Sequence, residues 1–472
     1  MSEIPTTIHG LLAAYRRGHL TPIEVVDHHL AHLGRVEPKL NAFAVVDRDA
    51  ARHAAQQSTS RWQRGDRVGD LEGVPITVKD IVAMAGLPTR EGSRVTSELK
   101  ALVDSPVVAR LREAGAVILG KTNTPEFGWK GITDSPAFGT TRSPWNPEFS
   151  PGGSSGGAAA ALAAGVGVAA HGNDGGGSIR IPASYCGLIG LKPTFGRVPQ
   201  APVESPYATL VANGPLTRSV EDAALLLNVM SRPDIRDWHA VPHQSGDWRI
   251  GLNDGLRGVR IAYTERLGGA SVDPEVRRAC RSAVDRLAIE GYDVTELDEI
   301  IEPLRPQFEA YWKAGFAHRL RTIPAPRHND LEPDFRKLAE EGLDVTVEEI
   351  DAAYAARARL VARMRRLHLD FDLLITPTMP TPPPRADVVY HSSVFDRWDH
   401  AVPFTVPFNL TGQPAASVPV GLTGLGLPIG LQIVANHFRE ELILRAARVL
   451  LDLLAWRWPD PNLARRIAVL QA

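Results

Sequence analysis

The sequence is poor in cysteine, in long apolar runs and in excess charge of either sign. Only two of its 472 residues are cysteines, Cys186 and Cys280, which excludes a disulfide framework and a cysteine zinc site. No window of about 20 uninterrupted apolar residues occurs, so no segment is predicted to span a membrane. The formal net charge of −2 gives no global attraction to nucleic acid or to anionic lipid. The N-terminus lacks an apolar stretch behind a basic start, so the cytoplasm is the expected location.

Composition and periodicity predict a large folded α/β protein. Hydrophobic residues make up 44% of the chain and charged residues 22%, which is ordinary globular composition and argues against disorder. Residues 1–66 are predicted to form helices, one of which begins with a capping box at Thr21. Further along, strands and helices alternate, as in the strand Val259–Tyr263 and the helix predicted over about 273–290. We therefore expect one domain over residues 1–472, with a mixed central β-sheet covered by helices on both faces.

Two groups of ionisable side chains have simpler interpretations than binding sites. His28, His29 and His32 do not match the metalloprotease pattern, which requires a glutamate at position 29, so they are predicted to be surface or packing residues. A second group shares partly helical spacing and is predicted to form a solvated helix face: Arg357, Arg359, Arg363, Arg365 and Arg366.

Two glycine clusters that carry serine are the most informative part of the sequence. The first covers Ser150–Gly157 and contains Ser154 and Ser155, and the second is Gly175-Gly176-Gly177-Ser178, about one helix later. Glycines beside a serine let the backbone adopt unusual dihedral angles and let other groups approach closely. Nucleophilic catalysis needs an exposed hydroxyl together with backbone N–H groups that hold a developing oxyanion. The clusters therefore indicate a catalytic serine.

Lys79 follows an apolar, strand-like run within Gly73–Asp80. A lysine in this place is either a surface charge at the end of a strand or a buried amine that stays neutral and acts as a base. A lysine in solution has a pKa of about 10.4 and is a poor base at neutral pH, whereas burial lowers the pKa.

These motifs closely resemble the amidase signature family, over nearly the whole chain. The resemblance is highly specific in residues 73–197, which correspond to the catalytic core, and looser between about 230 and 370. Residues 1–66 would be N-terminal helices, and residues from about 300 to 400 a variable, partly helical region at the substrate pocket. The matching segments are Gly73–Asp80, Gly120–Asn123, Pro144–Pro147, Gly152–Gly157, Asp174–Ala183, Cys186–Pro193, Asn409–Ala415 and Pro428–Gln432.

The resemblance implies a serine-dependent amidase with a Lys–Ser–Ser triad. Ser178 would be the nucleophile and Lys79 the base, while Ser154, on a cis peptide in this family, would relay the proton. The reaction would pass through an acyl-enzyme and release ammonia or an amine, with no metal and no cofactor. The remaining implied roles are an oxyanion hole formed by the backbone N–H groups of Gly175, Gly176, Gly177 and Ser178, and loop support from Ser155 and from an Asp174–Arg180 pair.

The resemblance also implies a pocket for a small-molecule amide, with aryl amides, carbamates and esters as related substrates. It would be formed by the variable region together with Gly128, Trp129, Gly131 and Ile132. Nucleic acid and membranes are not expected as partners, and a homodimer is compatible with the sequence. At least half of the aromatic side chains that could line the pocket are expected to lie in the core instead: Trp129, Tyr311, Trp312, Phe316, Tyr390, Phe395 and Trp398.

Two other motifs match known patterns in letters but not in context. Gly115–Thr122 fits the P-loop, yet its middle residues Ala-Val-Ile-Leu favour a strand rather than a phosphate-binding turn. Gly153–Gly157 fits the nucleophile elbow around Ser155, but the two prolines within Trp145–Pro151 exclude the central strand that this elbow requires.

Two rival functions stay open from the sequence alone. The first is the glutaminase subunit of a tRNA-dependent amidotransferase, which shares this core but usually carries an acidic residue where this chain has Pro125. The second is a catalytically inactive binding protein that keeps the glycine-rich loops for packing.

Overall fold

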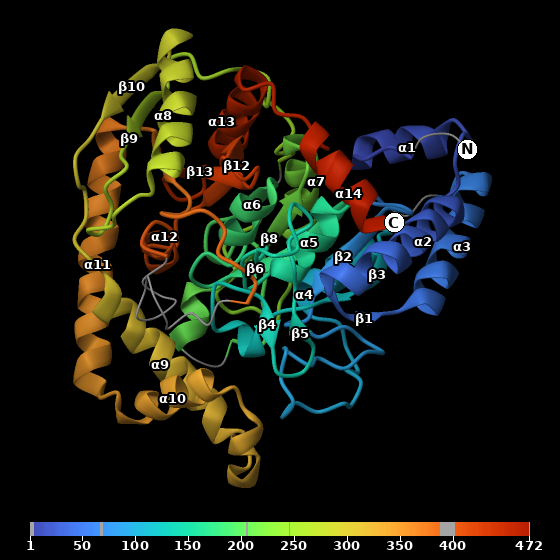
Figure 1. Ribbon diagram of the computed structural model, residues 1–472, viewed down its shortest axis with the longest axis horizontal. Helices are drawn as coiled ribbons and strands as arrows, with labels where there is room; N and C mark the ends of the chain where they lie inside the picture. The colour runs from blue at the N-terminus through green and yellow to red at the C-terminus, as the bar shows by residue number, and fades with distance from the viewer. Residues whose placement is uncertain (1–3, 67–68, 204–205, 245, 388–401, 472) are drawn as a thin grey trace.

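The described chain is organised around one mixed β-sheet (Figure 1). The computed structural model describes residues 4–66, 69–203, 206–244, 246–387 and 402–471. Within them, β4 (Asp134–Ser135) and β5 (Gly139–Thr140) pair as a separate small sheet. Eleven described strands make up the large sheet, in the spatial order β1 (Phe43–Val46), β3 (Val117–Thr122), β2 (Pro75–Lys79), β6 (Ala169–Asp174), β8 (Ala212–Thr217), β7 (Ile189–Lys192), β12 (Ala415–Leu422), β13 (Pro428–Ala435), β11 (Leu373–Pro377), β9 (Arg260–Tyr263) and β10 (Asp293–Glu296).

Both parallel and antiparallel pairs occur in this sheet, as the sequence predicts. β2 is parallel to both β3 and β6, whereas β8 is antiparallel to both β6 and β7. Every residue of β2, β7 and β13 is buried, which requires packing elements on both faces of the sheet. The predicted fold class is therefore confirmed.

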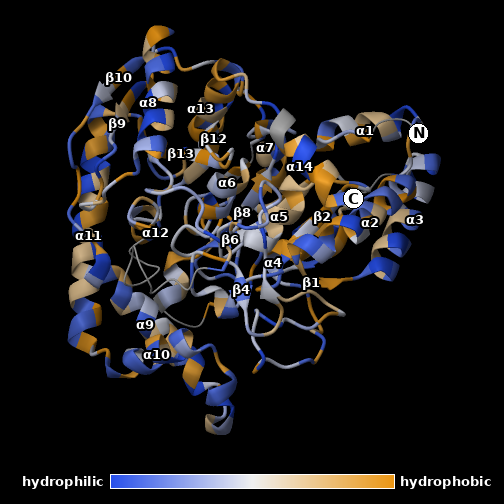
Figure 2. Cartoon of the chain, in the orientation of Figure 1, coloured by the Kyte–Doolittle hydropathy of each residue, from blue (hydrophilic) through white to orange (hydrophobic). Residues whose placement is uncertain are grey.

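Helices surround the sheet and form an outer arm far from the N-terminus. In Figure 1, α9, α10 and α11 lie on the side opposite α1–α3, and Figure 2 shows polar and apolar patches alternating along α11. The described helices are α1 (Ile8–Arg16), α2 (Pro22–Leu40), α3 (Arg48–Arg64), α4 (Pro106–Glu113), α5 (Gly156–Ala163), α6 (Arg180–Cys186), α7 (Val220–Met230), α8 (Pro274–Ile289), α9 (Arg305–Arg321), α10 (Pro333–Glu341), α11 (Val347–Asp370), α12 (Val406–Leu410), α13 (Glu440–Leu453) and α14 (Pro461–Gln471), with 3₁₀ turns η1 (Glu126–Gly128), η2 (Pro206–Leu210), η3 (Ala325–Asp330) and η4 (Gly342–Asp344).

Helix α5 explains why the first glycine cluster leads into a run of small residues. All eight of its residues are buried, and it packs against α6 and β6. A Cβ atom on Gly157 would lie 2.4 Å from the carbonyl oxygen of Ala42 and 2.5 Å from the backbone nitrogen of Asn123. Only small residues fit so close to neighbouring backbone, so this helix holds the loop before it in a fixed place.

Two predictions from the sequence were wrong in part. Residues 1–66 contain β1 besides the three helices, because Asn41 ends α2 in a left-handed conformation and the apolar segment after it pairs with β3. Arg357 is not on a solvated face: its guanidinium donates to the carbonyl oxygens of Leu410 and Thr209. The other predicted arginines of α11 are exposed.

Several local predictions were confirmed. Thr21 forms the capping box of α2, and residues 117–122 form β3 rather than a phosphate-binding loop. His29 and His32 are buried and bond to the backbone carbonyls of Gly165 and Ala164, so they pack. Among the helices that the structure describes, none is both long and apolar enough to cross a membrane.

Candidate active site

The sheet register brings Lys79 and the second glycine cluster together. Val78 of β2 pairs with His171 of the parallel strand β6, so the carboxyl ends of both strands lie at one edge of the sheet. Lys79 is the last residue of β2, and Asp174, the last of β6, leads directly into Gly175–Ser178. Ligand and catalytic sites of α/β sheets lie at this edge.

Lys79 is buried and contacts one serine and one amide. Its Nζ atom lies 2.7 Å from Ser154 Oγ and donates a hydrogen bond of 2.6 Å to Asn173 Oδ1. The exposed fraction of Lys79 is 0%, compared with 2% for Ser154 and 6% for Ser178. The lysine is therefore held within proton-transfer distance of a serine in a site from which water is nearly excluded.

Burial changes the acid–base behaviour of Lys79. It lowers the pKa of the ammonium group to about 7, although the negative charge of Asp174 opposes this shift. A large fraction of Lys79 is consequently neutral at neutral pH, as required of a general base.

A second buried lysine, Lys192, has a similarly low pKa but different contacts. Burial and the nearby charge of Arg180 lower its pKa to about 7. Its Nζ atom donates to the backbone carbonyls of Pro193 and Gln413, at 3.1 and 2.5 Å. Of these two lysines, only Lys79 is hydrogen-bonded to a serine side chain, which distinguishes it as the candidate base.

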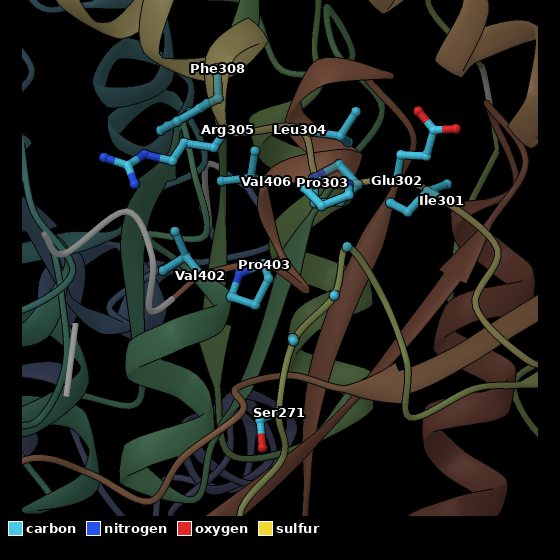
Figure 3. A pocket seen from close by; sticks show the side chains of 14 residues that line it. Ser271, Ile301, Glu302, Pro303, Leu304, Arg305, Phe308, Val402, Pro403 and Val406 are labelled. Carbon is cyan, nitrogen blue, oxygen red and sulfur yellow. The ribbon is translucent and has the colours of Figure 1, made fainter. Parts of the chain in front are cut away.

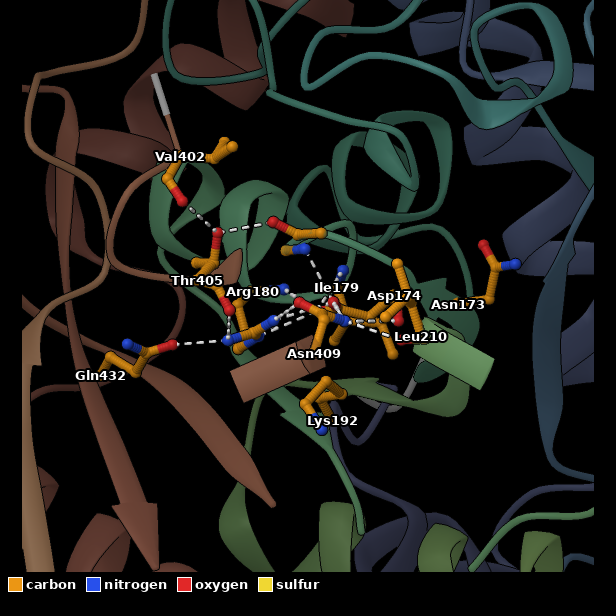
Figure 4. A network of polar contacts seen from close by, with 12 residues as sticks. Asn173, Asp174, Ile179, Arg180, Lys192, Leu210, Val402, Thr405, Asn409 and Gln432 are labelled. Atoms are coloured by element: carbon orange, nitrogen blue, oxygen red, sulfur yellow. Dashed lines mark hydrogen bonds and ion pairs between the residues drawn. The ribbon is translucent and has the colours of Figure 1, made fainter. Parts of the chain in front are cut away.

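The loop that carries Ser178 is fixed by a buried ion pair between Asp174 and Arg180 (Figure 4). Both side chains are fully buried, and Arg180 donates from Nε to one carboxylate oxygen and from Nη2 to the other, each at 2.9 Å. Burial alone would raise the pKa of Asp174, but the Arg180 guanidinium holds it well below its usual value. Asp174 is therefore ionised, and its oxygens also accept the N–H groups of Gly177 and Ile179.

Residues far along the chain complete the shell around Arg180. Its Nη2 atom donates to Asn409 Oδ1 at 2.6 Å, and its Nη1 atom donates to Gln432 Oε1 at 2.7 Å. Thr405 accepts from Nη1 through its carbonyl oxygen and donates from its hydroxyl to the carbonyl oxygen of Gly176. The C-terminal motifs recognised in the sequence thus anchor the ion pair that shapes the nucleophile loop.

The predicted oxyanion donors differ in availability. The N–H of Gly177 donates to Asp174 Oδ1 at 2.7 Å, so this group is used within the loop itself. Gly175, Gly176 and Ser178 have no such acceptor among the described backbone and side-chain hydrogen bonds.

Ser155 and the glycines beside it hold the two serine loops against each other. Ser155 donates from Oγ to the carbonyl oxygen of Asn173 and from its backbone N–H to that of Ser178, both at 3.2 Å. The Gly153–Ser154 peptide is cis. A Cβ atom on Gly153 would lie 2.5 Å from the carbonyl oxygen of Ile132, so no larger residue fits there.

A cavity of about 300 Å³, here called the Asn173 cavity, opens beside the candidate triad. Asn173, which binds Lys79, lines it together with Ile81, Phe127, Tyr207 and Phe316. A Cβ atom on Gly128 would lie 3.2 Å from Ser154 Oγ, which places the turn Phe127–Gly128 directly against that serine. The cavity thus lies next to Ser154 and Lys79.

A second cavity, of about 360 Å³, lies near the nucleophile loop, and Figure 3 shows the side chains that line it. Phe308 and Val406 line it, and the Phe308 ring would contact a Cβ atom on Gly176 at 3.2 Å. Phe308, Trp312 and Phe316 follow one face of α9, with centroids of neighbouring rings 4.7 and 5.3 Å apart. An aromatic row therefore runs from this second cavity past the loop to the Asn173 cavity.

The predicted pocket residues play mixed roles. Gly128 and Ile132 contact the serine loops, and Gly131 lies near Ile181. Trp129 is buried and donates its indole N–H to Glu332 at 2.8 Å, so it joins the variable region to the core. Phe127, next to it, lines the Asn173 cavity and was missed, although its large ring beside predicted pocket residues was a usable signal. Of the aromatic candidates, Tyr390, Phe395 and Trp398 lie outside the described residues.

No metal centre is evident in the part of the chain that the structure describes: three or more His, Cys, Asp and Glu side chains are nowhere grouped to hold an ion. Asn173 is the main member of the site that sequence reasoning did not single out.

Comparison with known proteins identifies the family. The family model described as Amidase matches residues 24–444. The chain belongs to the amidase signature family. It is 34% identical over 449 residues to an acylamidase of Rhodococcus erythropolis, covering 93% of each chain. It is 36% identical over 486 residues to a glutamyl-tRNA(Gln) amidotransferase subunit of Geobacter metallireducens, covering 97% of this chain and 99% of that protein.

Structural comparison agrees with the sequence. The crystal structure of a bacterial aryl acylamidase of the amidase signature family superposes with a TM-score of 0.89 at 28% identity, over 99% of this chain and 98% of that one. As a member of this family, the chain is an amide hydrolase, an enzyme that acts on carbon–nitrogen bonds other than peptide bonds.

Proposed function

We propose that this enzyme cleaves small-molecule carboxamides through an acyl-enzyme on Ser178, with Lys79 as the base and Ser154 as the proton relay. The observation that carries the proposal is the buried contact of 2.7 Å between Lys79 Nζ and Ser154 Oγ. A neutral lysine in this contact can take a proton from Ser154, whose oxygen can at the same time accept one from Ser178.

The first half of the reaction forms the acyl-enzyme. Ser178 Oγ attacks the carbonyl carbon while its proton passes to Ser154 Oγ, and the proton of Ser154 passes to Lys79 Nζ. Backbone N–H groups of Gly175, Gly176 and Ser178 stabilise the oxyanion, and loss of one such donor typically costs about 10²–10³ in rate. The intermediate collapses when Lys79 returns a proton, through Ser154, to the leaving nitrogen.

The second half releases the acid. Water replaces the departed amine, loses a proton to Lys79 through Ser154, and attacks the acyl carbonyl. Collapse of the second intermediate breaks the ester bond to Ser178 Oγ, which regains its proton. The net reaction consumes one amide and one water, and yields a carboxylic acid and an amine.

Asn173 and Asp174 prepare Lys79 for both halves. Asn173 Oδ1 accepts one N–H of the amine, which leaves the lone pair of the neutral nitrogen free to face Ser154. Asp174 raises the pKa of Lys79 and so prevents burial from lowering it further. The base consequently remains able to capture a proton near neutral pH.

The direct test is hydrolysis of a panel of primary amides, anilides, carbamates and esters by the purified enzyme. Turnover of at least one amide that is lost in Ser178→Ala, while Ser155→Ala retains most of it, is the expected result. Equal loss in both variants, or full activity in Ser178→Ala, contradicts the proposal.

The pKa of Lys79 predicts the pH dependence of the reaction. Below a pKa of about 7 the amine is protonated and cannot act as a base, so kcat/KM should rise as the pH increases through about 7. The profile is measured with a neutral substrate, so that only enzyme groups titrate. A profile that is flat or falls through this range contradicts the assignment of Lys79.

A glutaminase role within an amidotransferase is the second candidate, because 97% of the chain aligns with the amidotransferase relative. It predicts release of ammonia from glutamine that increases when the other components of such a complex are added. Efficient turnover of anilides by the isolated chain, without glutaminase activity, favours the stand-alone amidase.

A further inference from the structure

A pair of opposite charges lies in the wall of the Asn173 cavity. Glu91 and Arg319 both line this cavity and form an ion pair with each other. Glu91 precedes α4 in the catalytic core, whereas Arg319 belongs to the last turn of α9 in the variable region. Their side chains are 16% and 38% exposed, so solvent screens the pair only in part.

Glu91 is held in place by its backbone. It adopts a left-handed conformation with a φ of 49°, and its carbonyl oxygen accepts the N–H of Phe127 at 2.7 Å. Phe127 is also left-handed, with a φ of 52°. Non-glycine residues adopt this conformation at an energetic cost and tend to do so at functional sites.

Arg319 has a second contact that does not depend on Glu91. Its guanidinium carbon lies 4.6 Å from the centroid of the Phe127 ring, a distance typical of a cation–π contact. If the charge of Glu91 were removed, this stacking would keep the guanidinium at the cavity wall.

The charge of the cavity wall depends on this pair. Among its described lining residues, Glu91 and Arg319 are the two that carry a formal charge at neutral pH, and His318 is exposed on the helix surface. The polar groups Asn173, Gln200 and Asn213 are neutral amides. The wall is therefore neutral while Glu91 and Arg319 are both present, and loss of either one alone leaves it with a net charge.

The position of the cavity indicates which part of the substrate enters it. In the proposed reaction Ser154 delivers a proton to the leaving nitrogen, so this nitrogen faces Ser154. The turn Phe127–Gly128 lies directly against Ser154, and Phe127 continues into the cavity wall. The group attached to the leaving nitrogen is thus directed toward Glu91 and Arg319.

We infer that the Asn173 cavity receives the amine side of the substrate, and that the Glu91–Arg319 pair makes the enzyme select amides of uncharged amines. This inference rests on the proposed function. In each single variant the remaining charge of the pair attracts an oppositely charged substituent on the amine side of the substrate. Glu91→Gln favours a substituent with a carboxylate, and Arg319→Gln favours one with an ammonium group.

The test is a double-mutant cycle with matched substrates. The probes are three anilides of one acyl group, whose para substituent is methyl, carboxylate or aminomethyl. Glu91→Gln should raise kcat/KM for the carboxylate relative to the methyl anilide by about tenfold, and Arg319→Gln should do the same for the aminomethyl anilide. The double variant should return to the preference of the wild-type enzyme.

Two controls separate a cavity effect from a general one. Arg64→Gln removes a comparable arginine from the Arg64–Asp66 pair, whose side chains are 61% and 62% exposed, and should leave selectivity unchanged. A second series carries the same three substituents on the acyl group and should not respond to the variants. Thermal unfolding checks that each variant is folded. If Glu91→Gln does not fold, the charge preference of Arg319→Gln alone tests the inference.

The outcomes distinguish this inference from the proposed function. If the wild-type enzyme hydrolyses the methyl anilide through Ser178 but the cycle shows no change in charge preference, the inference is wrong and the amidase proposal stands. A change in charge preference that occurs only with the substrates substituted on the acyl group also overturns the inference. If no amide is hydrolysed at all, the proposed function fails and the inference fails with it.

Discussion

Lys79→Met is expected to lower kcat by about 10⁴- to 10⁶-fold without unfolding the protein, because loss of one member of a serine triad typically has effects in this range. Methionine fills a similar volume and is suited to a buried site, but it cannot accept a proton from Ser154. The residual activity would come from the oxyanion donors and from substrate binding. The kcat/KM of the variant should lack the rise with increasing pH through about 7 that the wild-type enzyme is expected to show.

The measurement compares kcat and the pH profile of the two enzymes on one amide, with thermal unfolding as a check on folding. Ser155→Ala is the matched control within the site, since Ser155 contacts the backbone of Asn173 and not Lys79. A Lys79→Met enzyme that keeps more than about a tenth of the wild-type kcat would contradict the role of Lys79, because general-base catalysis is typically worth about 10²–10⁴.

Asp174→Asn is expected to lower the free energy of unfolding by about 3–5 kcal/mol, the typical cost of breaking a fully buried ion pair. The substitution preserves the shape of the side chain but leaves the Arg180 guanidinium as an uncompensated charge with 0% exposure. It also weakens the acceptor for the N–H groups of Gly177 and Ile179, so the nucleophile loop should loosen.

Urea unfolding at neutral pH measures this loss, and Asp298→Asn provides the control. Asp298 pairs with Arg266 at 3.0 Å, but both side chains are largely exposed, so its removal should cost less than about 1 kcal/mol. Equal losses of unfolding free energy in the two variants would show that the buried ion pair stabilises the fold no more than the exposed pair does.

The sequence predicts the fold class and the position of the site because its motifs carry their own chemistry. Ser154 and Ser178 stand in glycine-rich segments and Lys79 ends an apolar strand, all three matching a family pattern, and the structure brings Lys79 and Ser154 into contact. The roles of the three residues in catalysis stay a prediction. The Asp174–Arg180 pair was also foreseeable, because its two residues flank the same loop.

Other parts of the site depend on contacts that local sequence does not encode. The contact of Asn173 with Lys79 arises from the register of β2 and β6, and no motif marks that pairing. Asn409 and Gln432 stand in recognisable motifs, but their common partner Arg180 is more than 200 residues earlier in the chain. Glu91 and Arg319 meet across a similar separation, one in the core and one in the variable region.

The strand β1 was missed for a related reason. Its four residues are too few to show the alternation of apolar and polar side chains that marks a strand, and they form a strand only by pairing with β3. The misplacement of Arg357 has the same origin: its helical spacing indicated an exposed face, but the carbonyl oxygens of Thr209 and Leu410 reach it from other elements.

Fluorophosphonate labelling, with the modified peptide mapped by mass spectrometry, tests the central claim most directly. The claim is that Ser178 is a nucleophile activated by Lys79 through Ser154. The account predicts a label on Ser178 in the wild-type enzyme that is lost in Lys79→Met. A label on Ser155, or no label at all on a folded protein that binds amides, would contradict it.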